Sequence, residues 1–244
     1  MKQNNTISVI MPVYNEAGCI EKTLRHVIGF CSLYSNYEFI IVNDGSTDKT
    51  QEILTKVLGN VCKYNISCVS YSPNQGKGYA VKTGVNFANG DYICYLDSDL
   101  AYSLDNLIIL ADKLENMDIV IGSRNQAKNN QKVSLIRKIA GKSFNYLSRI
   151  ILNLPFTDMQ AGIKGFKKDV AKNLFKHQFT SGFSFDVELI YLAWKWGYSI
   201  GEIPVVVLDT HINKKSKVNL FKDSLKMLLN LFQIQYNYRI GKYE

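Results

Sequence analysis

Short apolar runs alternate with stretches of helical periodicity along this sequence, and that alternation limits the fold more than any other feature. The runs Ile7–Met11, Glu38–Val42 and Asp91–Leu96 have the pattern of buried strands, and a polar loop and a helical stretch follow each of them. Repeated strand–helix units are typical of an α/β fold with a mostly parallel central sheet flanked by helices. In such sheets, ligands bind outside the carboxyl ends of the strands.

Acidic residues follow these runs. Glu16 comes after the first run, Asp44 after the second, and the tripeptide Asp97-Ser98-Asp99 after the third. Two neighbouring carboxylates are costly to desolvate unless a cation neutralises them. Mg²⁺ or Mn²⁺ is the simplest partner, and such ions usually bind substrate phosphates as well, so we expect Asp97 and Asp99 to be metal ligands. Ordinary turn chemistry, or capping of the next helix by Asp44, is the alternative.

The composition excludes several classes of protein. The chain has 244 residues, 46% of them hydrophobic, which is sufficient for a buried core. It contains no apolar run of the roughly 18 residues that a membrane helix needs, and its N-terminal residues lack the apolar segment of a signal peptide. The five cysteines show no Cys-x-x-Cys spacing, which favours reduced thiols without a zinc site in a cytoplasmic protein.

The net charge of +8 is unevenly distributed. No acidic residue lies between Asp118 and Asp158, and the segment 133–154 combines basic residues with apolar residues at helical spacing. Such a basic amphipathic helix is typical of proteins that bind an anionic membrane surface, where each Lys or Arg contributes about 1 kcal/mol. The tail 211–244 has a similar character, and it either packs on the domain or forms a second interfacial helix. We expect peripheral membrane binding and no nucleic-acid partner, because no nucleic-acid-binding motif is present.

Several motifs, taken together, resemble those of the family 2 glycosyltransferases of the GT-A fold. They are Met11–Glu16, Val42–Asp48, Asn74–Gly78 with Ala80, Leu96–Leu100 and Gly122–Arg124. The second half resembles the polyprenyl- and dolichyl-phosphate sugar synthase branch, through Thr157–Phe166, Phe185–Leu189, Glu202–Val205 and Lys215–Val218. The resemblance implies a GT-A catalytic domain over 1–210, with a nucleotide-binding half at 1–122 and an acceptor half at 123–210, followed by the basic amphipathic tail.

The activity that this resemblance implies is an inverting, metal-dependent glycosyl transfer. A hexose would move from a UDP- or GDP-sugar, with UDP-glucose favoured over GDP-mannose, to a polyprenyl phosphate at the cytoplasmic face of a membrane. A lipid monophosphate is largely a dianion at neutral pH because its second pKa is about 6, so it needs cations rather than a general base. The same catalytic core acting on a saccharide hydroxyl in polysaccharide or glycan assembly is the alternative, and a non-catalytic sugar-nucleotide sensor is a third interpretation.

The resemblance also assigns roles to individual residues. The catalytic residues would be Asp97, Asp99, Arg124 and Asp186, with Asp97 and Asp99 holding Mg²⁺ or Mn²⁺. Asp186 is a possible base or acceptor-orienting residue, and a helix N-cap is its alternative role. The nucleotide sugar would be bound by Pro12, Tyr14, Asn15, Glu16, Asp44, Gly76, Lys77, Asp97, Ser98, Lys215 and Lys217. The acceptor would be bound by Asp158, Gln160 and Lys164, together with Arg137, Lys138 and Lys142, which are candidates because they lie in the basic stretch without acidic residues.

Overall fold

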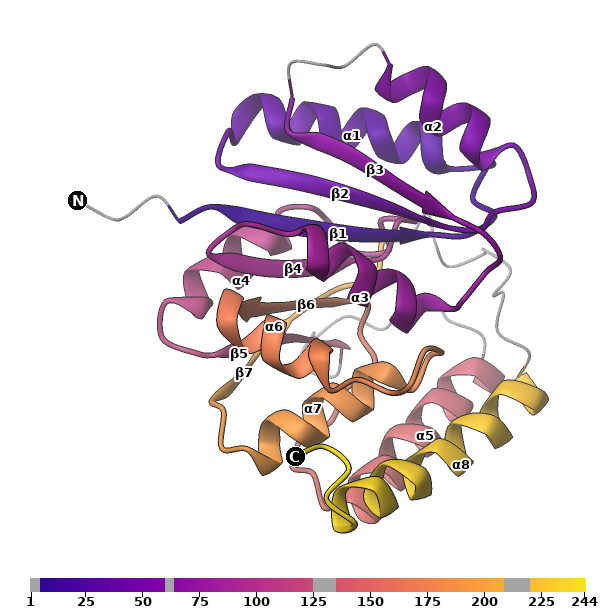
Figure 1. The fold of residues 1–244 in the computed structure, drawn as a ribbon, viewed down its shortest axis with the longest axis vertical. Coiled ribbons are helices and arrows are strands. Elements are labelled where there is room, and N and C mark those ends of the chain that lie inside the picture. Colours follow the sequence, from indigo (N-terminus) through magenta and orange to yellow (C-terminus); the bar gives the residue numbers. More distant parts are fainter. Residues whose placement is uncertain (1–4, 60–63, 125–134, 209–219) are drawn as a thin grey trace.

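The structure is a computed structural model that describes residues 5–59, 64–124, 135–208 and 220–244. A twisted central sheet lies between two layers of helices (Figure 1). The elements are, in chain order, β1 (Ile7–Val13), α1 (Ile20–Leu33), β2 (Tyr37–Asp44), α2 (Thr50–Leu58), β3 (Ile66–Tyr71), α3 (Lys77–Phe87), β4 (Tyr92–Leu96), α4 (Asn106–Leu114), β5 (Ile119–Ser123), α5 (Leu135–Leu152), β6 (Ile163–Lys167), α6 (Lys168–Lys176), α7 (Phe185–Lys195), β7 (Ile200–Pro204) and α8 (Leu220–Arg239).

The sheet is parallel except for one strand. Its strand order within the described residues is β3-β2-β1-β4-β6-β5-β7. β1 is parallel to β2 and β4, β2 to β3, and β5 to β7, whereas β6 is antiparallel to both of its neighbours. The predicted α/β fold with a mostly parallel sheet flanked by helices is confirmed. Because β6 is reversed, its first residue, Ile163, pairs with Leu96 at the end of β4, so the segment that enters β6 lies at the carboxyl edge of the parallel strands.

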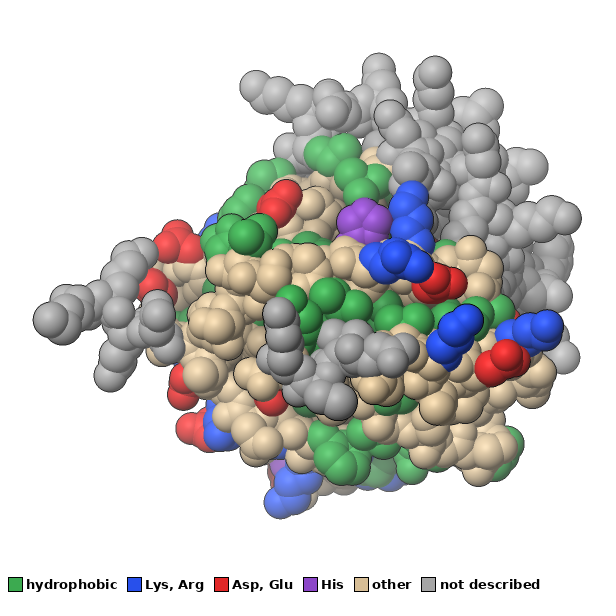
Figure 2. All heavy atoms as spheres, turned by 90° about the horizontal axis from the view of Figure 1, so that it is seen from above, with side chains coloured by type: hydrophobic (Ala, Val, Ile, Leu, Met, Phe, Trp, Pro, Cys, Tyr) green, Lys and Arg blue, Asp and Glu red, His purple; other side chains and the backbone are tan. Residues whose placement is uncertain are grey.

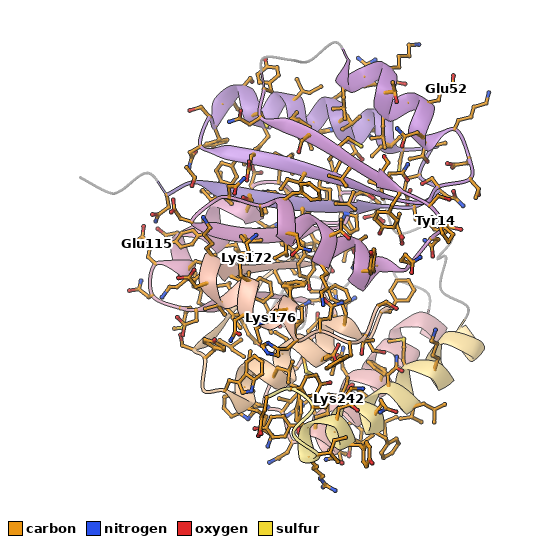
Figure 3. All side chains as sticks on the ribbon, in the orientation of Figure 1. Tyr14, Glu52, Glu115, Lys172, Lys176 and Lys242 are labelled. Atoms are coloured by element: carbon orange, nitrogen blue, oxygen red, sulfur yellow. The ribbon has the colours of Figure 1, made fainter. Side chains whose placement is uncertain are left out.

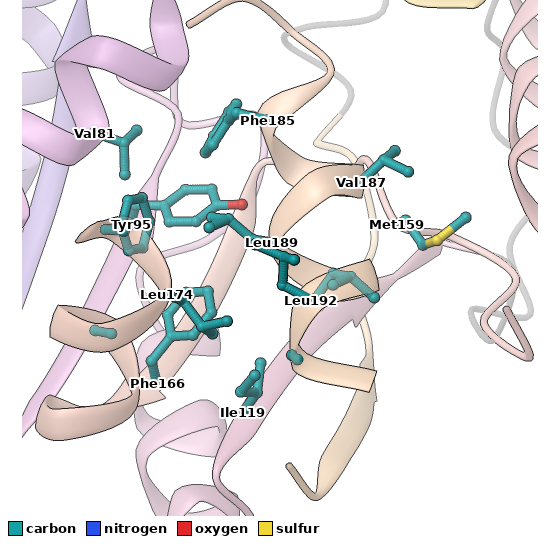
Figure 4. Close-up of a cluster of buried hydrophobic side chains, with 14 of the residues drawn as sticks. Val81, Tyr95, Ile119, Met159, Phe166, Leu174, Phe185, Val187, Leu189 and Leu192 are labelled. Atoms are coloured by element: carbon teal, nitrogen blue, oxygen red, sulfur yellow. The ribbon is translucent and has the colours of Figure 1, made fainter. Parts of the chain in front are cut away.

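Side chains of the central strands alternate between two hydrophobic cores. In β1, Val9 and Met11 pack on the face covered by α1, α2 and α4, while Ile10 packs on the face covered by α3, α6 and α7. Figure 4 shows part of the second core, where Phe166 of β6 and Leu189 of α7 are both buried. Burial of one such side chain contributes about 1.5–3 kcal/mol, so a one-residue slip of a central strand would be strongly unfavourable.

Helices α5 and α8 lie side by side next to α7 (Figure 1). Leu231 of α8 is fully buried, and the side-chain amide of Gln235 donates a hydrogen bond to the carbonyl oxygen of Ile151 at 2.7 Å. After the helix ends, the hydroxyl of Tyr243 donates to the carboxylate of Glu188 at 2.7 Å. One face of α8 therefore packs on the domain, while its opposite face is exposed, and an interfacial role for that exposed face stays a prediction.

One sheet runs through both predicted halves of the catalytic domain. The division at residue 122 stays a prediction, as does the boundary at 210, which lies outside the described residues. Within the part of the chain that the structure describes, every helix is too short or too polar to cross a membrane.

Candidate active site

The loops that follow β1 and β2 are tied together at the carboxyl edge of the sheet. Figure 3 shows Tyr14 at this edge and Glu115 at the opposite one. Asn15 has a φ of 51°, a left-handed conformation that Asn tolerates better than most residues. Its side-chain oxygen accepts the backbone N–H of Thr47 at 2.7 Å, and its own N–H donates to the hydroxyl of Ser46 at 2.9 Å. The predicted nucleotide-binding residues of the two loops are thus held in one surface.

Asp44, the last residue of β2, organises the loop that leads into α3. Its carboxylate accepts hydrogen bonds from the side-chain amide of Asn74 at 2.7 Å and from the backbone N–H groups of Gln75 at 2.7 Å and Gly76 at 2.9 Å. Gly76 has a φ of 97°, and a Cβ there would lie 2.7 Å from the carbonyl oxygen of Ser181, so only glycine fits. Asp44 therefore does not cap α2, the next helix along the chain, whose N-cap residue is Lys49.

Pro12, Glu16 and Ser98 occupy the same edge. Pro12 lies in β1 and is partly exposed, and the N–H of Glu16 donates to the hydroxyl of Thr50 at 2.8 Å. Ser98 is buried, and its carbonyl oxygen accepts a hydrogen bond from the hydroxyl of Thr23 in α1 at 2.7 Å. Ser98 thus anchors the acidic tripeptide through its backbone.

Asp97 and Asp99 follow β4 directly. The carboxylate Oδ1 of Asp97 lies 2.6 Å from Nζ of Lys77, the first residue of α3. The N–H of Asp97 donates to the carbonyl oxygen of Gly162 at 3.0 Å, and a Cβ on Gly162 would lie 1.9 Å from Asp97 Oδ2. Asp99 Oδ1 accepts the N–H of Ala101 at 3.0 Å. The glycine before the reversed strand therefore leaves room for the Asp97 carboxylate at the edge of the sheet.

Burial and neighbouring charges act on this ion pair in opposite directions. Burial raises the pKa of Asp97, the ammonium of Lys77 opposes that rise, and the carboxylates of Asp99 and Asp186 add to it. Burial also disfavours the protonated form of Lys77, but Asp97 and Asp186 outweigh it and raise the pKa of Lys77. Lys77 is therefore a cation among carboxylates, and its positive charge stabilises the ionised form of Asp97.

The donor atoms at this edge fit a hard divalent cation. Carboxylate oxygens are preferred ligands of Mg²⁺ and Mn²⁺, and an ammonium already lies against Asp97. Among the described residues, however, no group of three or more His, Cys, Asp or Glu side chains is arranged to hold an ion. Asp97 and Asp99 would therefore leave further coordination positions to substrate phosphates and water, as is usual for Mg²⁺.

Arg124 lies at the end of β5 and is held by Asp158. Its Nε and Nη2 donate to the two carboxylate oxygens of Asp158, each at 2.7 Å, and its backbone N–H donates at 2.9 Å. The Asp158 side chain is 1% exposed and that of Arg124 is 36% exposed. Burial raises the pKa of Asp158, but the bonds from Arg124 outweigh it and the net pKa is lowered. Asp158 thus orients a guanidinium that still reaches solvent.

Lys164 and Asp186 form a second ion pair, deep in the protein. Lys164 Nζ lies 2.6 Å from Asp186 Oδ1 and donates to the carbonyl oxygen of Ala161 at 2.8 Å. The hydroxyl of Tyr95 also donates to Asp186 Oδ1, and Figure 4 shows that hydroxyl pointing toward α7. The Lys164 side chain is fully buried, and burial lowers its pKa. The expectation that Lys164 contacts the acceptor directly does not fit this position.

The alternative role of Asp186 as a helix cap is wrong. The N-cap of α7 is Ser184, and Asp186 lies inside the first turn. Its carboxylate instead accepts from Tyr95 and Lys164, residues far away in the sequence. Tyr95 itself escaped the sequence analysis because it lies in an apolar strand; its only signal was a phenol two residues before Asp97.

Other predicted residues are less well defined. Gln160 lies in the segment before β6 and is partly exposed. Arg137, Lys138 and Lys142 lie on α5, but the structure does not describe their side chains, and Lys215 and Lys217 lie outside the described residues. Their predicted contacts with phosphates stay predictions.

Solved structures resemble this fold over most of its length. Glucosyl-3-phosphoglycerate synthase from Mycobacterium tuberculosis in complex with UDP superposes with a TM-score of 0.68 at 18% identity, covering 94% of this chain and 80% of that one. The same enzyme in complex with Mn²⁺, UDP-glucose and phosphoglyceric acid gives a TM-score of 0.67, covering 94% and 79%. These likenesses show a shared GT-A fold.

Sequence comparisons show the family. Residues 8–175 match the model of "Glycosyl transferase family 2". A dolichyl-phosphate β-glucosyltransferase of Dictyostelium discoideum is 32% identical over 98% of this chain and 76% of that relative. The enzyme of the same name from Saccharomyces cerevisiae is 32% identical over 97% of this chain and 76% of its own length. With the acidic tripeptide, its loops and the fold in agreement, the chain belongs to glycosyl transferase family 2 and is a glycosyltransferase.

Proposed function

We propose that this enzyme transfers a hexose, with inversion, from a nucleoside-diphosphate sugar to a polyprenyl phosphate. UDP-glucose is the favoured donor, because the relatives at 32% identity are named as dolichyl-phosphate glucosyltransferases and a solved structure of similar fold contains UDP-glucose. A GDP-sugar is the competing donor. The observation that carries the proposal is the convergence of Asp97, Asp99, Lys77 and Arg124 on the carboxyl edge of one sheet.

The donor side of the reaction needs positive charge at a leaving diphosphate. Asp97 and Asp99 would hold Mg²⁺ or Mn²⁺, and such an ion would supply Lewis-acid neutralisation of the charge on the departing diphosphate. Lys77, paired with Asp97, and Arg124, whose charge also interacts with Asp97, add positive charge beside this site. The loops held by Asn15 and Asp44 form the surface on which the nucleoside would lie. Preorganised positive groups of this kind stabilise the transition state by several kcal/mol.

The acceptor side favours a phosphate over a hydroxyl. An oxygen of the lipid phosphate attacks the anomeric carbon while the bond from that carbon to the nucleoside diphosphate breaks, and no proton has to be removed. A hydroxyl acceptor would need a general base. The candidate base, Asp186, is 3% exposed and already accepts bonds from Lys164 and Tyr95. The guanidinium of Arg124, by contrast, is partly exposed and suited to a phosphate.

We also propose that the enzyme binds the cytoplasmic surface of a membrane through α5 and α8. These helices and the residues just after α8 expose large apolar side chains beside exposed basic ones, which matches an anionic lipid surface. The apolar residues are Tyr146, Leu147, Ile150, Leu229, Phe232, Tyr236 and Ile240, and the basic residues are Arg149, Lys226, Arg239 and Lys242. At the far end of the molecule, above α1 and α2, acidic and basic side chains lie among one another (Figure 2).

The membrane proposal is tested with the double substitution Leu229→Glu/Phe232→Glu. Because each apolar side chain contributes about 1.5–3 kcal/mol when it leaves water, we expect partition onto vesicles containing anionic lipid to fall at least tenfold in sedimentation. Leu33→Glu is the matched control, since Leu33 is 77% exposed on α1. Equal partition of both variants and the unmodified protein would contradict this surface.

The reaction itself is tested by extraction. The enzyme is incubated with radiolabelled UDP-glucose, Mn²⁺ and undecaprenyl or dolichyl phosphate, and the product is partitioned between organic solvent and water. Product in the organic phase, absent with Asp97→Asn, is the expected result. Product that stays in the aqueous phase with added saccharides, and none in the organic phase, would favour the hydroxyl acceptor and overturn the proposal.

A further inference from the structure

Lys77 is placed so that its ammonium meets the same carboxylate that the donor site offers to a metal ion. Its Nζ lies 2.6 Å from Asp97 Oδ1, with 17% of the Lys77 side chain and 34% of the Asp97 side chain exposed. The ammonium also lies 6.0 Å from the ring centroid of Tyr95 and 5.9 Å from that of Phe185. Lys77 therefore fills a position that faces two aromatic rings on one side and the edge of the sheet on the other.

Hydrogen bonds hold the backbone on both sides of Lys77. The residue before it, Gly76, donates its N–H to Asp44 at 2.9 Å and is packed against the carbonyl oxygen of Ser181. The N–H of Gly78, just after it, donates to the same carbonyl oxygen at 2.7 Å. With the backbone held in this way, rotation about the bonds of the flexible Lys77 side chain is the simplest route by which the ammonium can move.

A divalent ion and this ammonium cannot both sit against Asp97 without strong repulsion. Mg²⁺ binds carboxylate oxygen at about 2.0–2.1 Å, and two like charges about 4 Å apart repel by several kcal/mol near a protein surface. When a diphosphate is present, however, the ammonium gains an alternative anionic partner within the same site. The two cations then share the negative charge of the carboxylates and the phosphates.

We propose that Lys77 is an exchangeable counter-ion of the donor site, which neutralises Asp97 while the site is empty and moves to the diphosphate when donor and metal bind together. This inference rests on the proposed metal-dependent donor binding. Its consequence is coupling: the free enzyme binds the metal weakly, and the nucleoside diphosphate strengthens metal binding by relocating Lys77. Linkage requires that the metal strengthens binding of the nucleoside diphosphate by the same factor.

The test measures Mn²⁺ binding, by electron paramagnetic resonance of free Mn²⁺, with and without saturating UDP. For the unmodified enzyme we expect UDP to raise the affinity for Mn²⁺ by a factor within the roughly 5–150-fold range of such couplings. Lys77→Met should bind Mn²⁺ several-fold more tightly than the unmodified enzyme when UDP is absent, and UDP should strengthen its Mn²⁺ binding much less. Lys77→Arg, which keeps the cation, should retain weak binding in the absence of UDP.

Lys82→Met is the matched control. Lys82 lies on the same helix and donates to the backbone carbonyls of Lys176 and Gln178 rather than to a carboxylate. Removing its charge should leave both Mn²⁺ affinities unchanged, and thermal melts check that all variants are folded. If UDP strengthens Mn²⁺ binding by Lys77→Met as much as by the unmodified enzyme, the proposed role of Lys77 is overturned, while the metal-dependent function is not. No Mn²⁺ binding by the unmodified enzyme even with UDP would overturn the metal-dependent function and this inference together.

Discussion

Two lysine–aspartate ion pairs, Lys77–Asp97 and Lys164–Asp186, lie near Tyr95. They have the same N–O distance but different surroundings. In both pairs the N–O distance is 2.6 Å. Lys164 and Asp186 are 0% and 4% exposed, whereas Lys77 and Asp97 are 17% and 34% exposed. The distance alone therefore does not separate a structural ion pair from an exchangeable one. The two pairs differ instead in the solvent exposure of their side chains and in the number of further hydrogen-bond partners.

The buried pair, Lys164–Asp186, has further hydrogen bonds to groups around it. Asp186 Oδ1 also accepts from Tyr95, and Lys164 also donates to the carbonyl oxygen of Ala161. A buried charge is tolerated when its hydrogen-bonding capacity is filled, so this pair joins β4, β6 and α7 beneath the site. The Lys77–Asp97 pair lies where the strands end, and its charges remain available to a ligand.

The largest expected effect concerns the pair at the edge. Asp97→Asn should lower the rate of glycosyl transfer at least about 10³-fold, because loss of the carboxylate that we propose holds the metal would remove several kcal/mol of stabilisation from the leaving diphosphate. Asp99→Asn should behave similarly. Initial rates with radiolabelled donor give the effect. Thermal melts should show a folded protein in each case, and a large loss of stability would assign these aspartates a structural role instead.

The second prediction contrasts stability between the pairs. Lys164→Met should lower the free energy of unfolding by about 3–5 kcal/mol, since it leaves Asp186 buried without its cation. Lys77→Met should lower it by less than about 1 kcal/mol, as for partly exposed pairs. Urea denaturation of both variants measures the difference. Equal losses would remove the distinction between the two pairs.

A double substitution sharpens this contrast. In Lys164→Met/Asp186→Asn both charges are absent, and the Asn oxygen can still accept the hydroxyl of Tyr95. Much of the stability lost in Lys164→Met should therefore return, because the penalty comes chiefly from the unpaired carboxylate. If the double variant is less stable than Lys164→Met, the pair contributes net stability and the account of an uncompensated charge is wrong.

The smallest expected effect is a pH dependence from a third pair, Arg124–Asp158. The pKa of Asp158 is lowered from its ordinary value of 3.8. The stability that this pair provides is therefore complete above that ordinary value and is lost as the pH falls through the lowered pKa. Asp158→Asn should flatten the corresponding part of the stability profile, measured by urea denaturation at successive pH values. An unchanged acid limb in this variant would contradict the assignment.

Local patterns were sufficient to predict the elements and the acidic edge. Apolar runs of strand length, followed by helical periodicity, place β1, β2 and β4, and a parallel sheet then brings Asp44 and Asp97 to one edge. These predictions depend on periodicity and on the common direction of parallel strands, and both can be read over a few residues.

The partners of the buried charges could not be predicted in this way. Lys164 has the sequence signature of a surface cation, and its pairing with Asp186 and Tyr95 exists only because β6 runs antiparallel beside β4. Strand direction depends on how the whole sheet is assembled, and no local pattern records it. The same reversal sets Gly162 against the carboxylate of Asp97, a close contact that the sequence block around Gly162 does not explain by itself.

The central claim is that Asp97 and Asp99 hold a divalent cation that carries the donor diphosphate. A crystal structure of the enzyme with Mn²⁺ and UDP, with the ion located by anomalous scattering, tests it directly. We expect the ion to bind a carboxylate oxygen of both aspartates and the diphosphate, with Lys77 Nζ moved from Asp97 onto a phosphate oxygen. A bound UDP with no ion at these carboxylates, or an ion coordinated elsewhere, would contradict the account.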